Sequence, residues 1–157
     1  MQRGNNFYSI DSSSLIHGWR RVYRPKNFGF IWERIEALAI EGRLRASIEV
    51  LHEIGKKDDD LYGWCKDRKE HLFVEVDDAC QMQLARIMTA YPRLVDTVKG
   101  RSAGDPFVIA LAASGRGITV VSEESPGKWR IPDVCAAEGI PCIGLADLIE
   151  QEDWRFA

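Results

Sequence analysis

Short apolar runs alternate along the chain with longer segments that have helical periodicity. The apolar runs predict strands at residues 6–10, 44–46, 72–76, 118–121 and 140–143. Apolar residues spaced three and four apart predict helices around residues 30–39, 48–54, 61–65, 82–88, 107–112, 131–138 and 145–151. Short, continuously apolar strands that alternate with helices are typical of a parallel sheet covered on both faces. The pattern therefore predicts an α/β fold in three layers, with a central parallel sheet between helices.

Polar residues and glycines predict where these elements begin and end. Ser47 and Asp77 or Asp78 are expected to cap helices, and the three aspartates at 58–60 are expected to cap another rather than bind a metal. Asp105, followed by proline, is expected to cap the helix that it opens. The polar stretch 96–104 predicts a loop, and Pro25 and Gly29 predict a loop around the basic and aromatic residues 19–26.

Length and composition are those of an ordinary globular protein. The chain has 157 residues, of which 45% are hydrophobic and 29% charged. A chain of this size can bury about two-thirds of its surface, so its core needs no disulfide or metal. We expect one domain over residues 1–157, with its core at about 7–150. Four cysteines without a C-x-x-C pair predict free thiols rather than a zinc site, and Trp32, Trp64, Trp129 and Trp154 are expected to anchor the core or an interface.

Charge and hydropathy narrow the range of partners. The formal net charge is −3, which argues against a general nucleic-acid coat but leaves room for a nuclease whose acids hold metal ions. The apolar runs are far shorter than the roughly 20 residues of a membrane span, and the first residues show no secretory signal pattern. The expectation is a cytoplasmic protein that does not engage a membrane.

Several acidic residues follow predicted strands or open predicted helices. Asp11 ends the first strand, Glu124 follows the strand at 118–121, and Asp105 opens a helix. Glu49 and Glu53 lie one turn apart on another helix. Ligands of parallel α/β sheets bind at the carboxyl ends of the strands, so these acids are expected to converge there. Carboxylates around an open pocket suit Mg²⁺ or Mn²⁺, which activate water and neutralise a phosphate.

Four segments together resemble the PIN domain, a family of metal-dependent ribonucleases. They are Asp-Ser-Ser-Ser-Leu at 11–15, Val-Leu-His-Glu-Ile at 50–54, Gly-Asp-Pro-Phe-Val-Ile-Ala at 104–110 and Val-Val-Ser-Glu-Glu at 120–124. The resemblance extends from residue 8 to about 148, and the tail from 131 to 156 is similar to a bacterial branch of PIN-like proteins. It implies a three-layer PIN-like fold.

The resemblance also implies roles for individual residues. It places Asp11, Glu53, Asp105 and Glu124 at the four acidic positions that hold Mg²⁺ or Mn²⁺. Ser122 stands where the family often has a supporting hydroxyl, and Ser13 is a polar neighbour that orients the first aspartate. The family commonly has Asp where this chain has Glu124, so Glu123 is an alternative for that position. Glu49 is an alternative for Glu53.

The segment with Trp19 and Tyr23 carries four basic side chains, Arg20, Arg21, Arg24 and Lys26. Such residues bind RNA phosphates and stack on unpaired bases, although a solvated loop or a partner-binding surface fits them equally well.

The function implied by the resemblance is hydrolysis of RNA phosphodiester bonds by a metal-activated water. It further implies the toxin of a bacterial type II toxin–antitoxin pair, with an antitoxin protein as partner and a homodimer as assembly. The main alternative is a PIN-like module that binds RNA or protein without cleaving. A small phosphatase is disfavoured because Ser13 interrupts the expected Asp-x-Asp motif, and nucleotide-binding glycine motifs do not occur.

Overall fold

A computed structural model describes residues 6–94 and 104–155. Its described strands form one sheet in the order β3-β2-β1-β4-β5, and every neighbouring pair is parallel. The strands are β1 (Phe7–Ile10), β2 (Leu44–Ser47), β3 (Phe73–Val74), β4 (Ile118–Val121) and β5 (Cys142–Ile143). The predicted parallel sheet is confirmed, although β3 and β5 are shorter than the apolar runs suggested.

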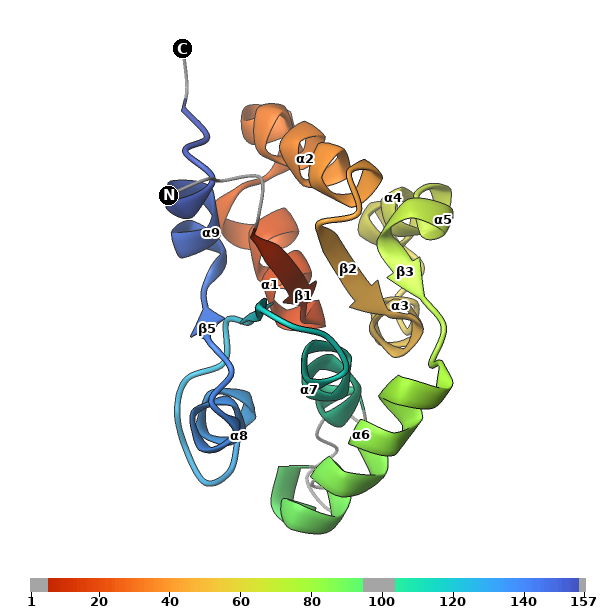
Figure 1. Ribbon diagram of the computed structural model, residues 1–157. Helices are drawn as coiled ribbons and strands as arrows, with labels where there is room; N and C mark the ends of the chain where they lie inside the picture. Colours follow the sequence, from red (N-terminus) through yellow and green to blue (C-terminus); the bar gives the residue numbers. More distant parts are fainter. Residues whose placement is uncertain (1–5, 95–103, 156–157) are drawn as a thin grey trace.

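Helices cover both faces of this sheet. They are α1 (Ser12–His17), the π-helix η2 (Gly18–Val22), α2 (Pro25–Ile40), α3 (Ile48–Ile54), α4 (Asp60–Asp67), α5 (Lys69–Leu72), α6 (Asp78–Ala90), the 3₁₀ turn η3 (Pro92–Leu94), α7 (Asp105–Ala113), α8 (Ile131–Glu138) and α9 (Leu145–Gln151). Helix α7 packs against the middle of the sheet, and α2 lies on the opposite face (Figure 1). The three-layer α/β/α arrangement is therefore confirmed.

The core lies between the central strands and these helices. Ile10 and Val121 are fully buried on neighbouring strands, and Ile109 of α7 and Ile35 of α2 are buried against them. The predicted caps at Ser47 and Asp77 are confirmed by side-chain bonds to the amides of Glu49 and Cys80. Asp59, the middle residue of the aspartate run, likewise caps α4.

The loop predicted around residues 19–26 is wrong. Gly18–Val22 form a π-helix, and α2 begins at Pro25, because proline suits the first helical turn. A Cβ at Gly18 would lie 2.8 Å from a methyl group of Leu145, so any larger residue would force that side chain to shift. The indole of Trp32 also donates a hydrogen bond to the carbonyl of Tyr23. Of the second predicted loop, residues 96–103 lie outside the described residues.

The cysteine and membrane predictions can be compared with the same residues. All four cysteines are free, and Cys65, Cys80 and Cys135 are buried while Cys142 is half-buried. Among residues 6–94 and 104–155, the helices include none with the length and hydropathy that a bilayer crossing requires.

A buried polar network joins the first strand to the end of the chain. Arg43 donates a 2.6 Å hydrogen bond to Glu152, and the Tyr8 hydroxyl donates to the same carboxylate oxygen. Both members of the ion pair are almost fully buried, with side chains 9% and 4% exposed. Burial and the neighbouring Glu152 raise the pKa of Tyr8, so this hydroxyl keeps its proton and remains a donor.

We expect Glu152→Ala to lower the free energy of unfolding by about 3–5 kcal/mol, because it leaves the buried guanidinium of Arg43 without its main counter-charge. Urea denaturation measures the loss. Glu150→Ala on the exposed side of α9 is the matched control and should change stability by less than about 0.5 kcal/mol. Equal effects of the two substitutions would contradict a stabilising role for the network.

Candidate metal centre

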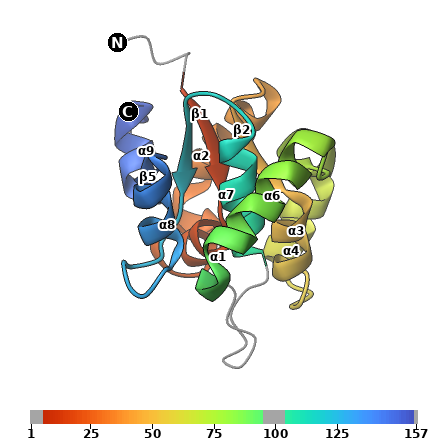
Figure 2. The same ribbon diagram turned by 60° about the horizontal axis from the view of Figure 1, so that its bottom comes forward.

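The pairing of β1 with β4 sets the position of the first acid. Ile10 lies opposite Val121, and the amide of Asp11 donates a 2.8 Å hydrogen bond to the Val121 carbonyl. Asp11 and Ser122 therefore leave two neighbouring strands side by side at their carboxyl ends. Both strands point toward the same end of the molecule (Figure 2), which is where ligands bind in open parallel sheets.

Helix α7 brings the second acid to this edge. Asp105 is the first residue of the helix, and Gly104 occupies the cap position without a side-chain bond. The expectation that Asp105 caps the helix is therefore wrong: its carboxyl turns to the acidic cluster and not to the helix amides. The hydroxyl of Ser9 on β1 donates a 2.9 Å bond to the Val108 carbonyl, which fixes the helix against the strand.

Three acids converge at this point. One oxygen each from Asp11, Asp105 and Glu124 lies within 4.8 Å of the other two. Asp11 is 1% exposed and Asp105 4% exposed, whereas Glu124 is half-buried. Oxygens at this spacing from different carboxylates match what a hard divalent cation requires.

The two oxygens of Asp11 have different surroundings. Oδ2 accepts hydrogen bonds from the hydroxyls of Ser13 at 2.6 Å and Ser122 at 3.0 Å. Oδ1 is buried and has no hydrogen-bond partner within the described part of the chain. A buried carboxylate oxygen without a donor carries a desolvation cost that a bound cation would remove. The residues present therefore fit a divalent metal.

Burial and mutual repulsion hold protons on the cluster. Burial, with the charges of Asp11 and Glu124, raises the pKa of Asp105 to about 9. Burial is also the main cause that raises the pKa of Asp11, partly offset by the hydrogen bond from Ser13. Asp105 is therefore mostly neutral at pH 7 when no metal is bound, and its proton lies between it and Glu124.

Glu53 lies outside the tight group of three but close enough to act on it. Its charge contributes to the raised pKa of Asp105, after burial and the charges of Asp11 and Glu124. Glu49, its alternative, pairs instead with His52 at 3.2 Å on the exposed side of the same helix. Glu53 thus acts electrostatically on Asp105, whereas the contact given for Glu49 is with His52, and the choice of Glu53 for the second acidic position stays a prediction.

Glu123 and Glu124 point to different parts of the fold. Glu123 accepts a 2.7 Å hydrogen bond from the amide of Leu145 and so sits at the start of α9. Glu124 joins Asp11 and Asp105, and its other contact is a 3.3 Å ion pair with Arg130. Sequence analysis did not identify Arg130. The two residues of this ion pair are six positions apart in a loop, and no local sequence pattern predicts such a pairing.

The basic residues predicted to bind RNA are spread over η2 and the start of α2. Arg20 pairs with Asp59 at 2.7 Å, and Arg24 donates to the Arg20 carbonyl. Arg21 and Lys26 are exposed. A cavity of about 320 Å³ is lined by Trp19, Arg20, Arg24, Pro25, Lys26 and Asp60. Arg20 is thus largely a structural cation, while the other three remain accessible.

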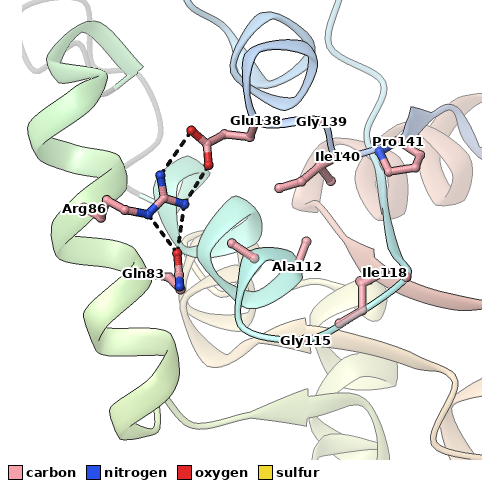
Figure 3. A pocket seen from close by; sticks show the side chains of 11 residues that line it. Gln83, Arg86, Ala112, Gly115, Ile118, Glu138, Gly139, Ile140 and Pro141 are labelled. Carbon is pink, nitrogen blue, oxygen red and sulfur yellow. Dashed lines mark hydrogen bonds and ion pairs between the residues drawn. The ribbon is translucent and has the colours of Figure 1, made fainter.

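A further cavity, of about 390 Å³, lies at the opposite end of the sheet beside Ile118, the first residue of β4. The guanidinium of Arg86 bonds to Glu138 of α8 at 2.6 Å and to Gln83 of its own helix at 2.8 Å (Figure 3). Its main cation is therefore already paired, and the cavity holds no cluster of acids. It is separate from the metal centre.

Comparison with known proteins places this geometry in a family. The sequence profile of a domain of unknown function, DUF4411, matches residues 8–156. The chain belongs to the DUF4411 family. A comparison with curated proteins finds no match.

Two crystal structures share the fold of this DUF4411 protein. DNA-bound VapBC from Salmonella typhimurium matches with a TM-score of 0.58 and 18% identity, over 88% of this chain and 98% of the matched one. VapBC2 from Rickettsia felis, bound to a DNA fragment from its promoter, matches with a TM-score of 0.54 and 11% identity over the same shares. Identities this low establish the fold alone. The expected PIN-like fold is confirmed.

The raised pKa of Asp105 makes a prediction about stability and pH. A carboxyl whose pKa is higher in the folded protein than its ordinary 3.8 binds its proton more tightly when folded. Its contribution to stability is complete below about pH 4 and is lost as the pH rises toward 9, by at most about 4 kcal/mol at pH 7. Asp105→Asn should therefore be more stable than the parent at pH 8 without metal and similar to it at pH 4. Thermal unfolding with a chelator present measures this, and a difference independent of pH would contradict it.

Proposed function

We propose that this protein is a metal-dependent ribonuclease formed by one PIN-like domain, and the toxin of a type II toxin–antitoxin pair. The observation that carries the proposal is the largely buried cluster of Asp11, Asp105 and Glu124, in which Asp11 Oδ1 has no donor among the described residues. Such a cluster is costly for stability unless a cation binds there. The PIN-like fold, which is typical of nucleases, and the position of the cluster at the carboxyl ends of β1 and β4 support this function.

The chain's own residues prepare the cluster for Mg²⁺ or Mn²⁺. Ser13 and Ser122 fix one oxygen of Asp11, and the other has no donor among the described residues. Arg130 orients Glu124, and Glu53 adds a further negative charge. When bound, the metal lowers the pKa of a water nucleophile and neutralises charge on the scissile phosphate.

Proton release is part of metal binding at this site. Asp105 must give up the proton that burial and repulsion hold on it before its carboxylate can serve as a ligand. Activity is therefore expected to rise with pH through the neutral range. Exposed Arg21, Arg24 and Lys26 supply local positive charge through which an acidic protein attracts RNA phosphates.

The proposed function also includes a protein partner, an assembly and a cellular compartment. The two solved structures compared above are VapBC complexes, which supports an antitoxin protein as partner of this chain. We also propose a homodimer in the cytoplasm, where RNA is accessible.

Purified protein should cleave single-stranded RNA only when Mg²⁺ or Mn²⁺ is present. Asp11→Asn and Asp105→Asn should each lower the rate by more than about 100-fold, since even residues that only orient metal ligands contribute 10–100-fold. Gel analysis of labelled RNA measures this. Unchanged cleavage by both variants, or none by the parent across varied RNAs and both metals, would overturn the enzyme and leave a binding module.

Adjacent glutamates provide matched controls for the same assay. Glu124→Gln should lose activity, whereas Glu123→Gln should keep it because Glu123 contacts α9. Glu53→Gln should weaken activity more than Glu49→Gln on the same helix. Calorimetric titration with Mn²⁺ should show the same ranking, which separates loss of metal from loss of the fold.

The toxin assignment predicts a growth phenotype. Induced expression in a bacterial host should arrest growth, and Asp11→Asn should abolish the arrest at equal protein level. Co-expression of the protein encoded beside this chain should restore growth. Arrest that persists in the Asp11→Asn variant would show that it does not come from hydrolysis at this site.

A further inference from the structure

Trp129 has an unusual backbone and an unusual environment. Its φ is +56°, and among the described non-glycine residues only Asp153 shares a positive φ. Its side chain is 43% exposed. A bulky residue in this backbone region is strained by about 1–3 kcal/mol, and such strain clusters at functional sites. Of the two expected roles for Trp129, an anchor in the core or at an interface, its exposure contradicts the core.

The loop around Trp129 is firmly held. The carboxylate of Asp133 accepts hydrogen bonds from the amides of Gly127 at 2.8 Å and Arg130 at 3.0 Å. The ring of Tyr91 lies 5.6 Å from the indole, inclined by 44°. The loop is therefore built to hold this indole at the surface.

Open space and positive charge flank the indole. A cavity of about 170 Å³ lies on the side of Tyr91 and Pro92, and one of about 300 Å³ lies on the side of Lys128 and Asp133. Arg93 lines both cavities. Arg93 and Lys128 are exposed, and neither is paired with a carboxylate in the parts of the chain that the structure describes. The one carboxylate there, of Asp133, is engaged by backbone amides.

This surface adjoins the metal centre. Arg130 follows Trp129 directly and contacts Glu124 through its guanidinium at 3.3 Å. The loop from β4 to α8 and the carboxyl end of α6 lie at the end of the molecule toward which β1 and β4 point (Figure 2). A strand bound at the acids could therefore reach the indole.

We propose that Trp129 is a stacking platform for an unpaired base of single-stranded RNA, with Arg93 and Lys128 holding phosphates beside it. An exposed aromatic face between free cations suits a chain that alternates flat bases with negative charge. A hydrophobic protein partner fits less well, because the residues around the indole are mostly charged or small. The proposal rests on the proposed function and defines its substrate as RNA with unpaired bases.

The test uses the Asp105→Asn protein, which we expect to bind RNA without cleaving it. Fluorescence anisotropy of a short labelled single-stranded RNA measures the binding. Trp129→Ala should weaken binding about tenfold, and Trp129→Phe should retain most of it because a ring is kept. Phe7→Ala is the matched control, since Phe7 is 42% exposed at the opposite end of β1. It should change binding by less than about twofold.

Trp129→Gly separates binding from folding. Glycine adopts a positive φ without strain, so this variant should unfold at the same temperature as the parent or higher. Its RNA binding should fall as far as that of Trp129→Ala. A tryptophan with a purely structural role would instead lower the unfolding temperature and leave RNA binding unchanged, which would overturn the proposal.

The outcomes distinguish the platform from the nuclease. If Trp129→Ala binds single-stranded RNA as well as the parent, or loses as much affinity for a duplex of the same sequence, the platform is overturned. Cleavage by the wild-type protein would in that case still support the nuclease. Sensitivity to Trp129 without wild-type cleavage supports the platform and overturns the nuclease. If Trp129→Ala spares RNA binding but breaks a complex with the antitoxin, the indole belongs to a protein interface and the RNA proposal fails.

Discussion

The parallel pairing of β1 with β4 is the contact on which the rest of the site depends. It sets Ile10 opposite Val121, so the two residues that follow, Asp11 and Ser122, leave the sheet at one place. Helix α7 precedes β4 and runs back across the sheet, which returns Asp105 to the same edge. Residues from distant parts of the chain thus meet because of backbone geometry, before any attraction between their side chains operates.

Those side chains in fact repel one another. Local interactions offset part of this repulsion. The hydroxyls of Ser13 and Ser122 donate hydrogen bonds to Asp11, and Arg130 forms an ion pair with Glu124. The raised pKa of Asp105 keeps a proton on that carboxyl at neutral pH. Each compensation is partial, so the apo protein stores electrostatic free energy in its most buried polar region. Proteins commonly accept such a loss of stability only where activity requires it.

Local patterns in the sequence predict most of the fold. Buried parallel strands appear as short apolar runs, and helices appear as apolar residues spaced three and four apart with polar capping residues at their starts. These patterns also indicate two candidate metal ligands: Asp11, which follows a strand, and Asp105, which begins a helix. Contacts between segments that are distant in the sequence cannot be predicted from such local patterns. Gly18, at the start of the helical residues 18–22, packs closely against the distant Leu145. The loop of Trp129 is held by hydrogen bonds to Asp133 that periodicity does not encode.

The network of Tyr8, Arg43 and Glu152 has a consequence for the order of events during synthesis. Tyr8 and Glu152 are separated by 144 positions, so β1 gains this partner only after residue 152 has left the ribosome. Until then the guanidinium of Arg43 lacks its main counter-charge, and the strand that carries Asp11 is less firmly fixed. The strand that positions the candidate metal centre is therefore fully anchored only after this last region of the chain has been translated.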